Sequence, residues 1–162
     1  MYKIDRSRFG KGLFATRRIP KGTLILRNKK GSTFHFLDTI VMGDTESHSL
    51  QIGPEEYVMC DKTFVYCNHS CEPNTGLNAK LEMIALRDIE DGEELFWDYS
   101  TWMLERHWEM NCYCGSSHCR QMVRDFDFLP HHIQSKYLQL QIVAPFIQEY
   151  LLKKAWPLSK AS

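Results

Sequence analysis

Three cysteines stand within eight residues of one another, at Cys112, Cys114 and Cys119, with Gly115 between them. Thiolates at this spacing on a bent loop are typical of a zinc knuckle, and a structural zinc ion takes four ligands in a tetrahedron. The loop supplies three, so the fourth must come from elsewhere in the chain. The candidates for this fourth ligand are Cys60, Cys67, Cys71, His69, His107 and His118. Free thiols of a reducing compartment are the alternative interpretation.

Three further segments carry residue types that could bind a ligand. GKGLFA (residues 10–15) has two glycines, which would let the backbone approach a cofactor closely. NHSCEPN (residues 68–74) places polar side chains directly after an apolar stretch, and GEELFWDY (residues 92–99) ends in a tyrosine. Taken singly, a tight turn, a capped turn and an edge strand with a buried tyrosine would explain them.

In this order, the four segments together resemble the SET domain of protein lysine methyltransferases and its post-SET zinc loop. The resemblance extends over residues 6–124. It implies an α+β fold of several small β-sheets, with a knot-like crossing between the second and third segments. It also implies a SET domain over residues 1–110 and a zinc loop over 111–125. Residues 126–162 lie beyond the shared motifs and are expected to form a helical C-terminal extension.

The resemblance also implies roles for individual residues. The main chain of the first segment would bind S-adenosylmethionine, and the start of the second would hold its methionine end and its adenine. These cofactor-binding residues are Lys11, Gly12, Leu13, Asn68 and His69. The family pattern selects Cys71 as the fourth zinc ligand. The implied ligands of one structural zinc ion are Cys71, Cys112, Cys114 and Cys119.

Tyr99 is then the catalytic tyrosine at the mouth of a lysine channel, with Tyr66, Phe96 and Trp97 as channel walls. Methyl transfer needs a free lone pair on the lysine nitrogen, whose ordinary pKa is about 10.4. An apolar channel and the positive sulfonium of the cofactor would both lower that pKa. Tyr99 would contribute a hydrogen bond that aligns the amine with the methyl group.

The chain departs from the family pattern at three places. Many members carry a Tyr-x-Gly-Glu string after the first strands, but residues 26–31 read LRNKKG, so that tyrosine's role is unassigned. Residues 65–67 read VYC where many members have Arg-Phe-Ile. Trp97 occupies a position that is often Phe or Tyr and tunes how many methyl groups are added, which leaves the methylation state open.

The missing tyrosine leaves two alternatives to an active enzyme. One is a non-catalytic, zinc-stapled domain that binds peptides; the other is an interaction domain that uses its helical tail. Retention of Asn68, His69 and Tyr99 favours the enzyme. The resemblance implies a protein substrate with a target lysine and does not identify it.

Charge and composition restrict the partners. Lys plus Arg and Asp plus Glu both number 20, so the formal net charge is zero, and we expect no direct nucleic-acid binding. A local cluster of basic residues between 17 and 30 is interpreted as a solvated face. The N-terminus has no apolar signal sequence and no segment is long enough to span a membrane. We therefore expect a cytoplasmic or nuclear protein.

The hydrophobic pattern predicts many short strands followed by helices. Strands are expected within residues 12–27, 34–59, 81–86 and 93–97, with turns at 43–44 and 53–54. Residues 63–68 are expected to form a buried strand or its end, and 101–110 a short helix. From Pro130, apolar residues at helical spacing predict helices, interrupted at Pro145 and ended by Pro157. This tail could cover the substrate groove, pack on the core or form a dimer.

Overall fold

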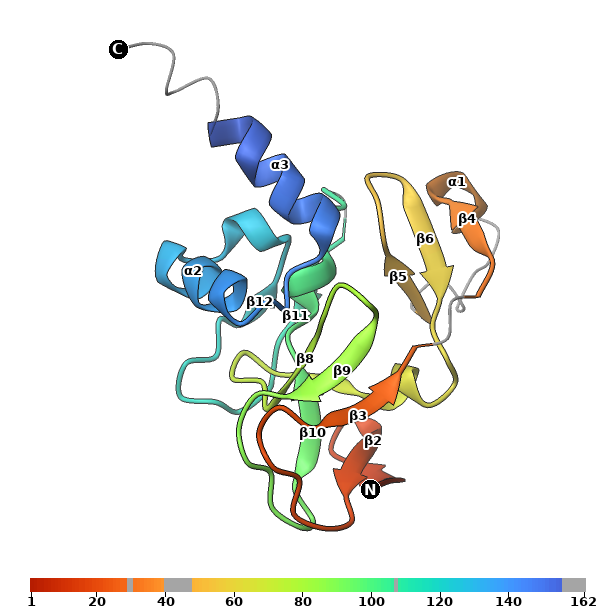
Figure 1. Cartoon of the computed structure of the whole chain (residues 1–162), viewed down its shortest axis with the longest axis vertical. Helices are drawn as coiled ribbons and strands as arrows, with labels where there is room; N and C mark the ends of the chain where they lie inside the picture. Colours follow the sequence, from red (N-terminus) through yellow and green to blue (C-terminus); the bar gives the residue numbers. More distant parts are fainter. Residues whose placement is uncertain (29–30, 40–47, 107, 156–162) are drawn as a thin grey trace.

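The computed structural model describes residues 1–28, 31–39, 48–106 and 108–155. The fold is α+β, as the sequence predicted: small sheets make up most of the body, and the two longer helices lie together at the C-terminal end (Figure 1). The N-terminus lies at the opposite end of the molecule from the last helix (Figure 1).

One sheet brings together the segments GKGLFA, NHSCEPN and GEELFWDY. Its strands, in order across the sheet, are β1 (Tyr2–Ser7), β2 (Gly10–Ala15), β10 (Glu94–Trp97) and β7 (Asn68–His69). β10 runs parallel to β7, with Phe96 opposite Asn68 and Trp97 opposite His69, and antiparallel to β2 on its other side. The segments around residues 12, 68 and 97 therefore lie side by side although they are far apart in the chain.

Two three-stranded sheets complete the strand body. The first consists of β3 (Leu24–Arg27), β9 (Glu82–Ala85) and β8 (Thr75–Leu77). The second consists of β4 (Thr33–His35), β6 (Glu56–Met59) and β5 (Ser49–Gln51). The strands expected within 12–27, 34–59, 81–86 and 93–97 are thus confirmed, with a short helix α1 (Phe36–Thr39) after β4. The turn expected at 43–44 lies outside the described residues.

Two predicted elements are wrong. Of residues 63–68, expected as a strand or its end, Phe64–Tyr66 form a 3₁₀ helix and only Asn68 belongs to a strand, β7. The expected helix over 101–110 is only a 3₁₀ turn, Tyr99–Trp102. Beyond that turn, distant side chains take the backbone amides that a helix would use. Leu104 donates to Gln51 Oε1 at 2.8 Å, and the amides of Glu105 and Arg106 donate to the carboxylate of Asp125 at 2.9 Å each.

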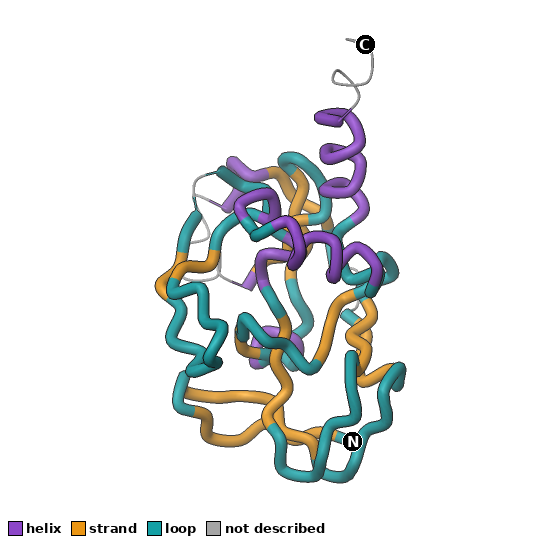
Figure 2. Tube along the Cα trace, turned by 90° about the vertical axis from the view of Figure 1, so that its left-hand side faces the viewer, coloured by secondary structure: helices purple, strands orange, loops and turns teal. Residues whose placement is uncertain are grey.

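The C-terminal extension packs on the core. A 3₁₀ helix (Phe126–Phe128) leads into α2 (His131–Gln139), and α3 (Pro145–Ala155) follows, so Pro145 begins the last helix; Pro157 lies outside the described residues. The two helices lie together on one side of the strands (Figure 2). The buried residues of the extension in the main core are Phe126, Leu129, Tyr137, Ile142, Val143, Ala144 and Ile147. A Cβ placed on Gly76 of β8 would stand 2.5 Å from Ile142, so the contact requires glycine.

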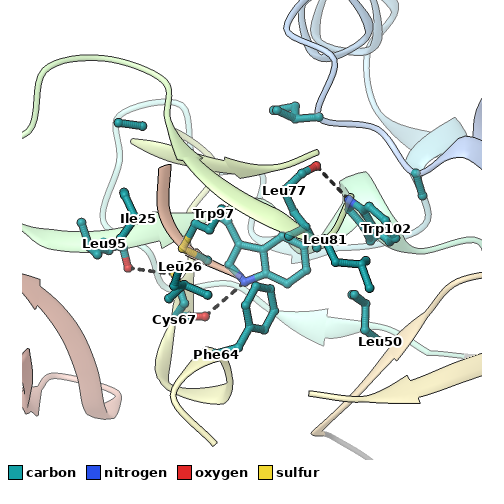
Figure 3. Packing of buried hydrophobic residues seen from close by; sticks show 14 of the residues in the cluster. Ile25, Leu26, Leu50, Phe64, Cys67, Leu77, Leu81, Leu95, Trp97 and Trp102 are labelled. Atoms are coloured by element: carbon teal, nitrogen blue, oxygen red, sulfur yellow. Dashed lines mark hydrogen bonds between the residues drawn. The ribbon is translucent and has the colours of Figure 1, made fainter. Parts of the chain in front are cut away.

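Two tryptophans, Trp97 and Trp102, are buried in the main core. Trp97 packs edge-on against Phe64 with ring centroids 5.4 Å apart, and its indole nitrogen donates to the carbonyl of Cys67 (Figure 3). Trp102 donates to the carbonyl of Leu77 at 3.1 Å (Figure 3). Each buried indole N–H therefore has an acceptor, as burial requires.

Candidate functional site

The side chain of Asn68 connects β7 to the backbone of β2 and to Glu94 of β10. Its amide nitrogen donates to the carbonyl of Lys11 at 3.0 Å and to Glu94 Oε1 at 2.7 Å. The pairing of β2 with β10 includes Leu13 and Phe14 and stops before Gly12. The backbone of Lys11 and Gly12 on this side of β2 therefore lies at the margin of the ladder, beside Asn68.

Glu94 lies where a side chain at position 12 would be. A Cβ on Gly12 would stand 2.2 Å from Glu94 Oε1, and Ser7 donates to the other carboxylate oxygen at 3.0 Å. The Asn68 amide nitrogen faces its two acceptors, the Lys11 carbonyl and Glu94 Oε1, so its amide oxygen points away from them. This oxygen is available to a donor on a bound ligand.

His69 is buried and its ring faces the protein interior. Its Nδ1 accepts a hydrogen bond from the backbone amide of Tyr99 at 3.3 Å, and its Nε2 lies 3.5 Å from Cys71 Sγ. Burial lowers the pKa of His69 to about 4, although the nearby carboxylate of Asp98 acts in the opposite direction. The imidazole is thus neutral at pH 7, and a ligand at this edge would meet the main chain of His69 rather than its ring.

The side chains of Tyr99 and Trp97 converge on one acceptor. The hydroxyl of Tyr99 donates to the carbonyl of Cys67 at 3.1 Å, and the indole of Trp97 donates to the same oxygen at 3.2 Å. Burial raises the pKa of Tyr99 far above its ordinary value, so its hydroxyl stays protonated. Tyr99 is accordingly a hydrogen-bonding group at neutral pH and not a base.

A cavity of about 400 Å³ opens beside this pair. Its lining combines aromatic and apolar side chains with four polar ones, and it comes from β5, β6, the 3₁₀ helix before β7, β10 and the segment after β10. The polar lining residues are His48, Ser49, Gln51 and Glu105. The aromatic residues that line it are Tyr57, Phe64, Trp97, Tyr99, Trp102 and Trp108. A long, narrow side chain could lose most of its hydration here.

Of the three residues expected to form the channel walls, one lines the cavity. Trp97 lines the cavity, but Tyr66 and Phe96 are not among its lining residues. Phe96 points to the other face of β10, since side chains alternate along a strand. Tyr66 lies instead against the first motif, with Lys11 Nζ 5.5 Å from the centre of its ring.

The cysteine loop folds back onto the second motif. The sulfurs of Cys71, Cys112, Cys114 and Cys119 all lie within 4.8 Å of one another, and those of Cys71 and Cys112 are 3.7 Å apart. In the described residues His69 and His118 lie outside this group, as do Cys60 and Cys67; His107 is not described. The short pairing of β11 (Met110–Asn111) with β12 (Met122–Val123) closes the base of the loop.

The donor set fits a zinc ion. Four thiolates around zinc at about 2.3 Å would have sulfurs about 3.8 Å apart, close to the separation seen here. Burial raises the pKa of Cys112 to about 11 and that of Cys71 further. Burial acts in the same direction on Cys114, but hydrogen bonds from the backbone amides of Cys71 and Ser116 lower its pKa to about 6. Cys114 is thus a thiolate at neutral pH, and a bound zinc ion would deprotonate the other thiols. A thiolate at neutral pH is the form that binds a metal. The cluster could therefore bind one zinc ion without rearrangement of the chain.

Comparison with known proteins agrees with this geometry. The family model described as "SET domain" matches residues 10–100, and the chain belongs to this family. A relative named "Methyltransferase flvH" from Aspergillus flavus is 27% identical over 111 residues, which cover 66% of this chain and 62% of that protein. A "Histone-lysine N-methyltransferase, H3 lysine-4 specific" from Emericella nidulans is 38% identical over 66 residues, or 34% of this chain and 5% of that protein.

Solved structures show the same fold. KRYPTONITE, in a complex with DNA, an H3(1–15) peptide and SAH, superposes with a TM-score of 0.61 at 23% identity, over 76% of this chain and 29% of that one. The chain thus spans less than two thirds of these relatives' own lengths. Within its described residues, no helix is long and apolar enough to cross a membrane.

Several residues of the site could not be found from the sequence motifs. Trp102 and Trp108 follow the third motif as a local enrichment of aromatic residues, which is a weak signal for a cavity wall. Phe64 and Tyr57 carry no such signal, because only the tertiary fold brings β6 and the 3₁₀ helix to the cavity. Glu94 belongs to the third motif, but its contact with Asn68 depends on the pairing of distant strands.

Proposed function

We propose that the protein transfers a methyl group from S-adenosylmethionine to the side-chain amine of a lysine in a protein substrate. The observation that carries the proposal is the convergence of Tyr99 and Trp97 on the Cys67 carbonyl, at the wall of a cavity that all three residues line. Family membership and the names of the relatives support the same reaction.

The cavity prepares the lysine for reaction by removing water. A lysine at pH 7 is almost wholly protonated, and presenting the neutral amine costs about 4–5 kcal/mol unless the site lowers its pKa. The aromatic walls disfavour the charged ammonium by desolvation. Tyr99 is protonated and donates to Cys67, so the proton of the amine leaves through solvent and not to this side chain.

Tyr99 orients the amine. Its proton points at the Cys67 carbonyl, so the oxygen's free lone pairs can accept an N–H from the lysine. That contact would rotate the nitrogen lone pair toward the methyl donor. Holding the two reacting groups in line is a large part of what a site of this kind contributes to the rate.

The proposed binding site for the methyl donor is the margin of β2 beside Asn68. When bound, S-adenosylmethionine supplies a methyl group on a positively charged sulfur. The Asn68 amide oxygen can accept from its ammonium group, and the main chain of Lys11, Gly12 and Leu13 lies next to that position. KRYPTONITE, whose fold is shared, binds SAH in its crystal structure.

The cysteine cluster would hold a structural zinc ion and fasten the loop after the third motif to Cys71. Cys112, Cys114 and Cys119 would then be held next to Cys71 of the second motif. The proposed domain division is a SET domain over 1–110, a zinc loop over 111–125 and a helical extension over 126–162. We propose a lysine-bearing protein such as a histone as the partner, in the nucleus or cytoplasm.

A binding experiment separates this proposal from the non-catalytic alternative. Calorimetry with S-adenosylmethionine should show binding to the wild type, about tenfold weaker binding to Asn68→Ala, and no change in Asn78→Ala, which alters a remote turn. Label from the methyl donor should then appear on lysine in a panel of histones and cell lysate. No binding by the wild type would favour the non-catalytic domain.

A further inference from the structure

A carboxylate that the proposed reaction does not use lies directly before the catalytic tyrosine. The side chain of Asp98 has no exposed surface. Its Oδ2 accepts from Arg120 Nη2 at 2.8 Å and from the hydroxyl of Tyr137 at 2.9 Å. Its Oδ1 accepts from the amide of Ser100 at 3.2 Å and lies 3.6 Å from His69 Nδ1.

Asp98 and the two side chains that donate to its Oδ2 come from three parts of the chain. Asp98 precedes the last residue of the third motif, Arg120 follows the last cysteine of the zinc loop, and Tyr137 lies in α2 of the helical extension. An ionised carboxylate in the interior is costly unless it is paired and hydrogen-bonded. The three groups therefore have to keep their positions relative to one another for the carboxylate to remain satisfied.

The charges of the network agree with this arrangement. The Arg120 guanidinium donates to both oxygens of the Asp98 carboxylate, with Nη2 at 2.9 Å from Oδ1 and 2.8 Å from Oδ2. Burial, reinforced by the same carboxylate, raises the pKa of Tyr137, so the phenol is protonated and can only donate to Asp98.

The network also fixes the backbone that carries Tyr99. The amide and hydroxyl of Thr101 donate to the carbonyl of Asp98 at 3.1 and 2.7 Å, and with the Ser100 contact they close the 3₁₀ turn Tyr99–Trp102. Arg120 meanwhile donates its own backbone amide to Cys71 Sγ at 3.4 Å. Asp98 therefore connects the turn to the cysteine cluster on one side and to the extension on the other.

We propose that Tyr137 is a positioning residue for methyl transfer: its hydroxyl holds Asp98, and through Asp98 the turn that aims Tyr99 into the cavity. This gives the helical extension a part in the reaction although none of its described residues lines the cavity. The inference rests on the proposed function, and the extension would act on turnover rather than on binding.

The test is Tyr137→Phe, which removes one hydroxyl and keeps the ring in the core. Its matched control is Tyr150→Phe in α3, where the ring faces Arg106 outside the network. We expect kcat to fall about tenfold in Tyr137→Phe, with KM values for S-adenosylmethionine and substrate within about twofold of the wild type. Tyr150→Phe should retain the wild-type kcat.

A second readout does not depend on activity. Hydrogen exchange at the amides of Ser100 and Thr101 should be faster in Tyr137→Phe than in the wild type, and unchanged in Tyr150→Phe. The comparison is made under conditions in which all three proteins have the same free energy of unfolding. If Tyr137→Phe does not fold, Arg120→Lys tests the same network and should show the same loss of kcat and local protection.

The outcomes are distinguishable. Reduced kcat together with local loss of protection supports the inference. A Tyr137→Phe protein that is only less stable, with wild-type kcat and wild-type protection of the turn, overturns it. A wild type that transfers no methyl group to any substrate contradicts the proposed function, while unchanged exchange at the turn would still contradict the positioning role.

Discussion

The hydroxyl of Tyr99 donates a hydrogen bond of 3.1 Å to the backbone carbonyl of Cys67, the residue just before the NHSCEPN segment. This one bond joins the second and third motifs at the wall of the cavity. It also fixes the direction of the phenol proton, which leaves the oxygen free to accept from a substrate amine. Trp97 bonds the same carbonyl and lies against Tyr99 with ring centroids 5.1 Å apart.

Trp97 should limit how many methyl groups the cavity admits. Trp97→Phe removes the indole N–H bond to Cys67 and part of the ring that lines the cavity. We expect the variant to be less stable by about 1–3 kcal/mol and to form more highly methylated lysine than the wild type. Mass spectrometry of the product measures this, and an unchanged or lower methylation state would contradict the assigned role of Trp97.

Removal of metal should unfold the cysteine loop. The four sulfurs lie within 4.8 Å of one another, and without zinc the loop would lose the metal bonds that fasten it to Cys71. A strong chelator should release one zinc ion per chain, increase hydrogen exchange over residues 111–125 and abolish methyl transfer. Cys71→Ser should lose the metal in the same way.

Cys60→Ser is the matched control for metal content, because Cys60 lies outside the cluster. It should retain a full complement of zinc by elemental analysis. A wild-type protein that binds no zinc, or one that keeps full turnover after complete chelation, would show that the cluster has no such role.

Docking of the helical extension depends on Gly76. A Cβ at this position would stand 2.5 Å from Ile142, whereas at Gly31 the nearest atom would be 3.6 Å away. Gly76→Ala should therefore lower the free energy of unfolding by about 1–3 kcal/mol, and Gly31→Ala should change it little. Chemical denaturation of both variants measures the difference, and equal stabilities would show that the contact with Ile142 is easily relieved.

The sequence predicted the strands better than the segment after Tyr99. Strands around residues 12, 82 and 95 follow from local alternation and turn residues, and they are confirmed. The helix expected at 101–110 failed because Gln51 and Asp125 take the backbone amides there. No local pattern reveals an acceptor that is many residues away in the chain.

The site shows the same limit. Spacing alone identified three cysteines of the cluster and left the fourth open among six candidates; the family resemblance selected Cys71, and the fold places it with the others. The network of Asp98, Arg120 and Tyr137 had no sequence signal, since its members come from three separate segments. The resemblance assigned His69 to the cofactor without saying which of its atoms would make the contact, and only the fold shows that its imidazole faces the interior.

The most direct test of the proposed function is the Tyr99→Phe variant in a methyl-transfer assay with labelled S-adenosylmethionine. The Cys67 carbonyl keeps its bond from Trp97, so the variant should fold and bind the methyl donor as the wild type does. We expect the wild type to label lysine in a protein substrate and the variant to lose about a hundredfold in kcat. Near-normal turnover by Tyr99→Phe would contradict the assignment of this tyrosine to catalysis.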